Sequence, residues 1–123
     1  MKKIIKTLLF IIAFAGVSFA QDGKVAGSMG SEALLKSKVS GDYTFVMPSD
    51  LTADNIAENS KYYTHYFTVE FDAGSHKATI HMVDNSAKSR FVIRRFMTAC
   101  GVNSIEVDKS NIDMDTFTEK YLQ

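Results

Sequence analysis

Two neighbouring segments, residues 65–72 and 77–83, alternate apolar and polar side chains with the period of two that is typical of half-buried strands. Their apolar positions are Phe67, Val69, Phe71, Ala78, Ile80 and Met82. The four residues between the segments include a glycine and have the length of a hairpin loop. Pairing Asp72 with Lys77 places all six apolar side chains on one face, whereas a shift by one residue would scatter them. The pattern therefore predicts an antiparallel hairpin in this register.

A strand followed by a helix is predicted ahead of the hairpin. Residues 43–47 are rich in β-forming residues, and Pro48 stops the strand. A stripe of apolar residues at helical spacing then runs through residues 51–63. Ser49 or Asp50 is expected to cap this helix, because short polar side chains accept hydrogen bonds from the free amides of a first turn.

A second helix and a last strand are predicted after the hairpin. Residues 86–100 carry an apolar stripe at helical spacing, with Ser86 or Ser89 as the cap and Gly101 at the end. Residues 104–108 resemble a strand in composition. The order strand, helix, strand, strand, helix, strand predicts the α+β class and a ferredoxin-like plan. In that plan, a four-stranded antiparallel sheet carries two helices on one face.

Two further segments flank this unit, a C-terminal helix after it and a glycine-rich stretch before it. Asn111 is expected to cap a C-terminal helix, with apolar residues at spacings of three and four: Met114, Phe117 and Tyr121. Residues 21–41 are rich in glycine and serine and are interpreted as a flexible leader, with docking of residues 33–35 as a helical turn left as an alternative. One domain is thus expected over residues 42–123.

The first 20 residues have the layout of a cleavable secretory signal. A basic start precedes an apolar run of about a dozen residues, which is shorter than the roughly 20 that a membrane-spanning helix needs. Ser18 and Ala20 supply the small residues expected before a cleavage site. The mature chain is therefore expected to begin near Gln21 and to be periplasmic or secreted, without a membrane-embedded part.

Charge and composition exclude some classes of function. The whole chain has 14 basic and 14 acidic residues, and removing the signal with its three lysines leaves the mature chain with a small negative charge. A mildly acidic exported domain is not expected to bind nucleic acid, since phosphate contacts require clustered Lys and Arg. The content of 46% hydrophobic residues excludes an intrinsically disordered chain. The single cysteine, Cys100, cannot form an internal disulfide.

The order of elements and the sequence from Met47 to Thr52 resemble the heavy-metal-associated domain of small copper chaperones. The resemblance extends over about residues 43–108. In that family, a methionine precedes a CxxC loop whose two thiolates hold a soft ion such as Cu(I). The resemblance implies that Ser49 and Thr52 occupy the two cysteine positions here. Neutral hydroxyls do not replace thiolates for soft metals, so the family scaffold is expected without its metal site.

Other candidate ligands are dispersed along the chain. Cys100 is expected to be a small buried hydrophobe at the end of a helix. The three histidines, His65, His76 and His81, do not form any motif with metal-ligand spacing, and are expected to be ordinary strand and surface residues. Weak binding of copper or zinc through Met47, a histidine or Cys100 remains the alternative hypothesis. No constellation of catalytic residues is found, so an enzyme is not expected.

The face of the predicted hairpin opposite its apolar residues is the candidate partner surface. It is formed by Tyr66, Thr68, His81 and Val83. An exposed patch that mixes apolar and polar residues is typical of a contact site for a protein or a small ligand. The alternative expectation, which is favoured because the apolar residues of the predicted C-terminal helix must pack against something, is that this helix covers the face. Taken together, the predicted signal, the lack of a catalytic constellation and the candidate surface favour a non-catalytic, exported interaction module.

Overall fold

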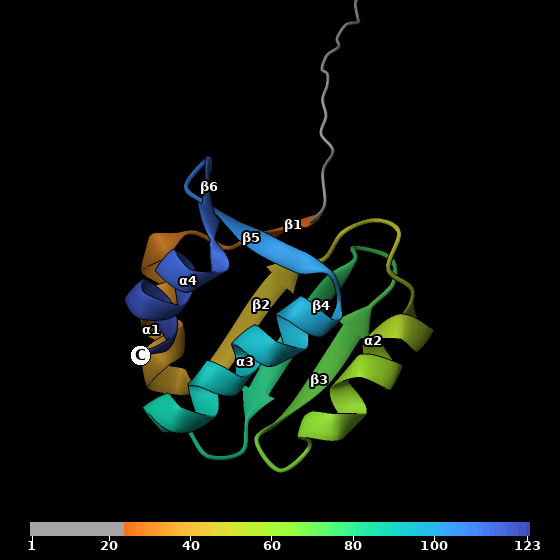
Figure 1. The fold of residues 1–123 in the computed structure, drawn as a ribbon, viewed down its shortest axis with the longest axis horizontal. Coiled ribbons are helices and arrows are strands. Elements are labelled where there is room, and N and C mark those ends of the chain that lie inside the picture. Colours follow the sequence, from red (N-terminus) through yellow and green to blue (C-terminus); the bar gives the residue numbers. More distant parts are fainter. Residues whose placement is uncertain (1–23) are drawn as a thin grey trace, which may run out of the picture.

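The computed structural model describes residues 24–123 as one α+β fold with a six-stranded mixed sheet and four α-helices (Figure 1). The predicted signal segment, residues 1–20, lies outside the described residues. The strands are β1 (Lys24–Ser28), β2 (Asp42–Val46), β3 (Phe67–Asp72), β4 (Lys77–Met82), β5 (Val102–Val107) and β6 (Ser110–Asp113). The α-helices are α1 (Ser31–Ser40), α2 (Ala53–Ser60), α3 (Ala87–Ala99) and α4 (Met114–Phe117). A short 3₁₀ segment, η1 (Lys61–Tyr63), follows α2, and a π-helical segment, η2 (Thr118–Leu122), follows α4.

The sheet has the strand order β3-β4-β2-β1-β5-β6, with β1 in its middle. β1 runs antiparallel to β2 and parallel to β5, and its Ala26 is fully buried. The predicted four-stranded antiparallel sheet is therefore wrong, because β1 separates β2 from the strand that was expected beside it. The α+β class is confirmed.

The prediction of a flexible leader over residues 21–41 is wrong for the part that the structure describes. β1 pairs on both sides, and α1 packs its Leu34 into the core with 2% of its surface exposed. Gly41 ends α1 in a left-handed conformation with φ of 83°, which glycine adopts at little cost. Gly41 thus marks the end of a helix, and the segment before it is a strand and a helix rather than a linker.

The predicted hairpin is confirmed in its register. Phe67 pairs with Met82, Val69 with Ile80 and Asp72 with Lys77. In the connecting loop, the Asp72 carboxylate accepts hydrogen bonds from the Gly74 amide and the Ser75 hydroxyl, at 3.0 and 2.9 Å. These bonds satisfy loop donors that the strands cannot pair, which fixes the turn and with it the register.

The first predicted helix begins later than expected, and the second begins at an expected cap. α2 is capped by Thr52, not by Ser49 or Asp50. α3 is capped by Ser86, whose Oγ accepts a hydrogen bond from the Ser89 amide at 3.2 Å. Gly101 follows α3 with φ of 85°, as the sequence predicts.

The C-terminal segment contains a strand that the sequence pattern does not predict. Asn111 lies in β6 rather than at a helix cap, and the helix cap is Asp113, whose Oδ1 accepts a hydrogen bond from the Thr116 amide at 2.7 Å. β5 and β6 are joined by Asp108 and Lys109, both with positive φ, as a tight two-residue hairpin turn requires. Lysine at such a position gives little sequence signal, so the sequence pattern does not indicate this hairpin.

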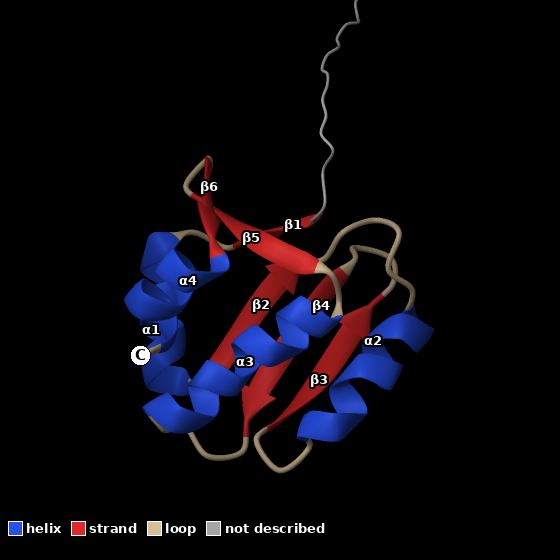
Figure 2. Cartoon of the chain, in the orientation of Figure 1, coloured by secondary structure: helices blue, strands red, loops and turns tan. Residues whose placement is uncertain are grey.

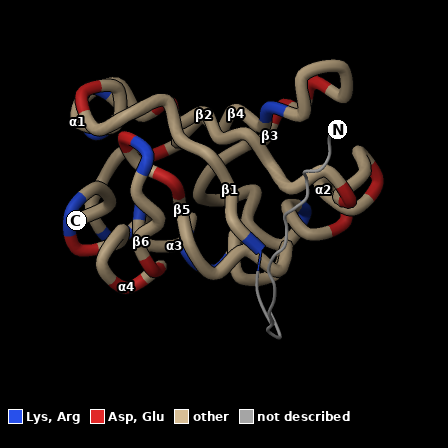
Figure 3. Tube along the Cα trace, turned by 90° about the horizontal axis from the view of Figure 1, so that it is seen from above, with Lys and Arg blue, Asp and Glu red and all other residues tan. Residues whose placement is uncertain are grey.

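α2 and α3 cover one face of the sheet, which we call the inner face, and the core lies between these helices and the strands (Figure 2). α2 and α3 lie on the same side of the strands when the molecule is seen from above (Figure 3). The opposite side of β2, β3 and β4 is here called the outer face. The largest fully buried side chains include Tyr43, Phe45, Phe67, Ile80, Ile93, Phe96, Met97, Ile105 and Phe117. Within residues 24–123, no helix is both long enough and apolar enough to span a bilayer.

Candidate interaction surface

The outer face carries the side chains that alternate with the buried positions of the strands. Tyr43 and Phe45 of β2 are fully buried, so Asp42 and Thr44 point the other way. In β3 and β4, the same alternation places Thr68, Glu70, Asp72, Lys77, Thr79 and His81 on the outer face. The alternation read from the sequence therefore assigns this face correctly.

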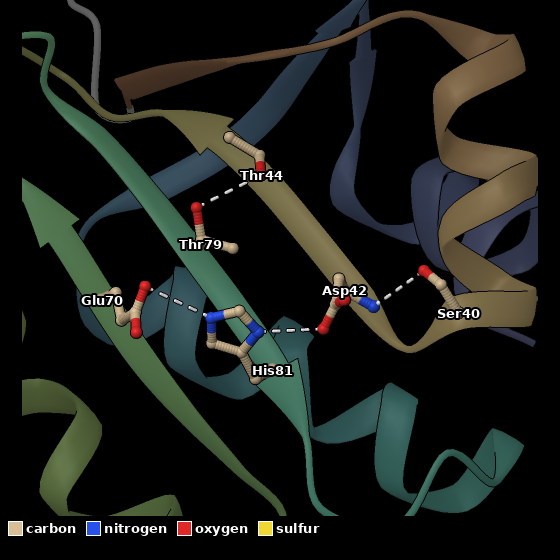
Figure 4. A network of polar contacts seen from close by, with 6 residues as sticks. All are labelled: Ser40, Asp42, Thr44, Glu70, Thr79 and His81. Atoms are coloured by element: carbon tan, nitrogen blue, oxygen red, sulfur yellow. Dashed lines mark hydrogen bonds and ion pairs between the residues drawn. The ribbon is translucent and has the colours of Figure 1, made fainter.

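His81 lies between two carboxylates that come from the strands on either side of β4 (Figure 4). Its Nδ1 lies 2.9 Å from Oδ1 of Asp42, and its Nε2 lies 3.4 Å from Oε1 of Glu70. Asp42 is directly opposite His81 in the β2–β4 pairing, whereas Glu70 is diagonal to it across the β3–β4 pairing. The histidine thus links three strands on one surface.

Two further contacts fix the surroundings of His81. The Asp42 amide donates to the hydroxyl of Ser40 at 3.1 Å, so the end of α1 is tied to the start of β2. Thr44 and Thr79 share a hydrogen bond of 3.3 Å between their hydroxyls. Cross-strand pairs of this kind hold side chains at fixed positions. The centre of the outer face is therefore small, polar and ordered.

The Asp42 hydrogen bond raises the pKa of His81, and Glu70 adds to this effect while partial burial opposes it. A histidine with a raised pKa stabilises the fold fully below its unfolded pKa of about 6.5, and the contribution is lost as pH rises through the higher folded value. Because all three side chains are well exposed, the pair is screened by solvent and contributes at most about 1 kcal/mol.

Replacing Asp42 by Asn is expected to lower the pKa of His81 toward its ordinary value. It is also expected to destabilise the fold by up to about 1 kcal/mol at about pH 5.5, and to have almost no effect near pH 8.5. An NMR titration of the His81 ring and urea unfolding at both pH values measure the two effects. An equal loss of stability at both pH values would show that the carboxylate acts through packing instead.

The outer face carries more carboxylates than cations. Asp42, Glu70 and Asp72 contribute negative charge from β2 and β3, and next to this face Glu106 of β5 lies beside Gly27 of β1. Lys77 supplies an ammonium group at one end of β4. A cationic partner is therefore favoured electrostatically, and protonation of His81 reduces this preference.

The four residues of the predicted partner surface, Tyr66, Thr68, His81 and Val83, lie at the end of this face where β3 begins and β4 ends. Tyr66 and Val83 are 37% and 63% exposed, and the Val83 amide donates to the Tyr66 carbonyl at 2.9 Å. Thr68 is exposed and pairs with His81 across the two strands. An aromatic and an aliphatic side chain thus flank the polar centre, the mixture that protein contact sites use.

The expectation that the C-terminal helix covers the outer face is wrong. Phe117 packs edge-on against Phe45 with ring centroids 5.9 Å apart, and the Tyr43 hydroxyl donates to the Tyr121 carbonyl at 2.9 Å. Both contacts are with inner-face residues of β2. The apolar side of the C-terminal segment therefore fills the core beside α3, and within the described part of the chain the outer face has no such cover.

The loop that resembles a metal-binding loop has a different arrangement. Met47 is 3% exposed and belongs to the core, while Ser49 and Thr52 are exposed. The Thr52 hydroxyl accepts a hydrogen bond from the Asn55 amide at 3.1 Å, and the Asn55 side chain accepts one from the Thr52 amide at 2.9 Å. Thr52 is thus engaged in a reciprocal cap of α2.

Replacing Thr52 by Ala is expected to lower the free energy of unfolding by about 1 kcal/mol, because the first turn of α2 loses its cap. Thr52→Ser keeps the hydroxyl and is expected to change stability by only a few tenths of a kcal/mol. Urea denaturation of the two variants beside Ser49→Ala measures the difference. A loss on Ser49→Ala as large as that on Thr52→Ala would contradict the assignment of the cap.

The remaining histidines and the cysteine lie apart from one another. His76 donates from Nε2 to the Leu51 carbonyl at 2.7 Å, which ties the hairpin loop to the loop before α2, and His65 is exposed. Cys100 is 4% exposed, as predicted, and the Asn59 amide lies 3.6 Å from its sulfur. Burial raises the pKa of the Cys100 thiol, so the reactive thiolate is disfavoured.

Among residues 24–123, no group of three or more His, Cys, Asp or Glu side chains is placed to hold a metal ion. Met47 and Met82 lie at opposite ends of β4, since Met47 contacts the backbone of His76 and Met82 ends the strand. Their separation of about 16 Å along the strand prevents them from sharing one ion.

Sequence reasoning found the candidate surface but missed the partners of His81. Glu70 could have been found from the hairpin register, which places it two positions from the residue opposite His81. Asp42 required the pairing of β2 with β4, which residues far apart in the sequence form. Comparisons of the chain with protein-family models, with curated proteins and with solved structures found no match.

Proposed function

We propose that the chain is an exported, non-catalytic interaction module whose outer face binds a protein partner that presents basic side chains. The observation that carries this proposal is the outer face, which residues 24–123 leave uncovered and on which His81 is held between Asp42 and Glu70 and flanked by exposed Tyr66 and Val83. A sheet face that carries ordered polar contacts and exposed apolar side chains is suited to recognition rather than to core packing.

The scaffold of this module is proposed to be ferredoxin-like with an inserted strand. If β1 is left out, the order of the remaining strands up to β5 is β3-β4-β2-β5, and α2 and α3 lie on one face. These features support a βαββαβ unit between Asp42 and Val107, extended by β1 and α1 at one end and by β6 and the C-terminal helical segments at the other. The resemblance to heavy-metal-associated domains is proposed for this unit alone.

Metal transport is not part of the proposed function. The two positions that carry thiolates in the resembled family carry hydroxyls here, and the Thr52 hydroxyl is already engaged by the Asn55 amide. Soft ions such as Cu(I) prefer thiolates over neutral oxygen ligands. Stoichiometric capture of Cu(I) or Zn(II) by the purified mature chain, with shifts of the Met47 or histidine signals in NMR spectra, would contradict this part of the proposal.

The partner surface is tested by site-specific photo-crosslinking in cells that express the chain with its N-terminal segment. A photoreactive phenylalanine analogue replaces Tyr66 on the candidate surface or, as the matched control, Tyr62, which is 69% exposed in η1. We expect one defined cross-linked protein from position 66 and none from position 62. Adding Glu70→Lys to the position-66 variant is expected to abolish the product, since it reverses a charge that attracts the partner.

Equal cross-linking from both positions would show non-specific contact and would contradict the proposal. The same holds for a product that persists with Glu70→Lys, because such binding would not depend on the acidic face. A cross-linked copy of the chain itself would overturn the proposal of a basic partner and assign the outer face to self-association.

A further inference from the structure

The two edges of the sheet differ in how available they are for a further strand. β6 has four residues and leads directly into α4, so its edge is short. β3 has six residues and, within the described residues, pairs with β4 alone. Every second amide and carbonyl of such a strand points away from the sheet, which makes it a template for an incoming strand. β3 is therefore the edge that could accept one.

A groove of about 450 Å³ runs beside β3, with α2 forming its other wall. Its lining includes Ile56, Ala57 and Lys61 on the helical side and Phe67, Val69 and Phe71 on the strand side. Ala57 is exposed, and Val69 and Phe71 are only half-buried. α2 and β3 lie side by side in Figure 1, so the groove follows the edge of β3 that no other strand of residues 24–123 pairs with.

We propose that this edge and groove bind an extended peptide segment, which adds a strand to β3. Backbone hydrogen bonds to β3 would supply affinity, and the groove would receive alternate side chains of the segment, because successive residues of a strand point to opposite faces. This site goes beyond the proposed function, because it uses the edge of the sheet and the α2 wall and shares the carboxylates of Glu70 and Asp72 with the outer face.

The charges beside the groove specify the chemistry of the segment. Glu70 and Asp72 project from β3 on the side away from the groove, and Asp54 and Glu58 are exposed on α2. Lys61 is the cation at the groove, and its ammonium is paired with Glu58 at 2.6 Å. A bound strand would therefore place apolar side chains in the groove and basic side chains beside Glu70 and Asp72. The segment is one in which apolar residues alternate with Lys or Arg.

These same charges disfavour a second copy of the chain as the occupant. Pairing of two β3 strands would bring Glu70 and Asp72 of both copies onto one face of the junction. Like charges at neighbouring positions of a sheet repel one another, and natural edge strands carry charges for this reason. A basic segment turns this repulsion into attraction.

The test is a titration of the folded chain with a synthetic peptide that alternates Val and Lys over the six-residue length of β3. NMR spectra are expected to show shifts and slowed hydrogen exchange for amides of β3, together with shifts along the groove side of α2. A peptide of the same composition with its valines and lysines in two blocks is the control. It is expected to bind at least about tenfold more weakly, because it cannot place charge and apolar side chains on opposite faces.

Ala57→Arg is the blocking variant, since its long side chain fills the groove while arginine is a good helix former. It is expected to weaken binding of the alternating peptide about tenfold or more, the size that loss of one interface anchor produces. The matched control is Ala87→Arg, the same change at an exposed position of α3, which is expected to leave affinity within about twofold.

Four results would overturn this proposal. The first is no binding of the alternating peptide, and the second is binding that Ala57→Arg leaves intact. The third is a shift pattern confined to Thr44 and Thr79 on the outer face, which would assign the peptide to the other surface. A dimer of the chain that Ala57→Arg dissociates would show that a second copy occupies the groove instead.

Discussion

A chain that begins at Asp42 is expected not to fold cooperatively, although the sequence pattern places the whole domain after this residue. The truncation removes β1 and α1, and with them two core side chains, Ala26, which is fully buried, and Leu34, which is 2% exposed. It also removes the strand that joins β2 to β5. We expect the loss to be comparable with the entire stability of a small domain, roughly 5–15 kcal/mol.

The reason lies in the spacing of strands. Neighbouring strands are about 4.8 Å apart, so β2 and β5 lie about 10 Å from each other with β1 between them. Without β1, backbone amides and carbonyls of both strands lose their partners in the middle of the sheet, and each unpaired buried group costs free energy. Closing the gap would require β5 to move together with β6 and the helices that pack on them.

Circular dichroism, the dispersion of NMR amide signals and urea unfolding measure this effect on chains that begin at Gln21 and at Asp42. The control is Val39→Ser in the longer chain, because Val39 is 85% exposed on α1 and its replacement is expected to change stability by no more than about 0.5 kcal/mol. A well-dispersed spectrum and a cooperative transition from the chain that begins at Asp42 would refute the prediction.

Phe117→Ala is expected to lower the free energy of unfolding by about 3–5 kcal/mol, as large-to-small changes of a buried aromatic residue do. Phe117 is fully buried and packs edge-on against Phe45. The centroid of its ring lies 5.4 Å from the centroid of the Tyr121 ring. Its removal leaves a cavity between β2 and the C-terminal segment. The neighbouring Thr118 is also buried and donates to the Met114 carbonyl at 2.6 Å, which limits how far the segment can collapse inward.

Urea unfolding of Phe117→Ala beside Glu119→Ala measures this effect, since Glu119 is exposed on the same segment. The Glu119 variant is expected to stay within about 0.5 kcal/mol of the parent chain. Phe117→Leu keeps most of the volume and is expected to lose less than the Ala variant. A loss below about 1 kcal/mol for Phe117→Ala would show that the C-terminal segment does not pack in the core as described.

Local patterns predicted the elements in which side-chain alternation and burial agree. The β3–β4 hairpin and α3 follow from spacing alone, because one face of each is strongly apolar. β1 gives no such signal. Its middle residues are Val25, Ala26 and Gly27, and a strand paired on both sides can hold its place through backbone hydrogen bonds with small side chains. Composition alone therefore suggested a linker.

The candidate surface divides in the same way. Its location on the outer face follows from the period of β3 and β4, so Thr68 and His81 could be assigned from the sequence. The role of His81 could not, because Asp42 reaches it across a pairing between strands that are 39 residues apart. Similarly, the groove beside β3 depends on where α2 lies against the sheet, which only tertiary packing determines.

The parallel pairing of β1 with β5 has a consequence for how the chain acquires its structure. Lys24 pairs with Val102 and Gly27 pairs with Glu106, so the middle of the sheet joins the first described strand to one near the C-terminus. Contacts between such distant segments form late, since a large loop must close before they are made. A nascent chain therefore cannot complete its sheet until β5 has been synthesised, so β1 waits without one of its two neighbours while most of the described chain is made.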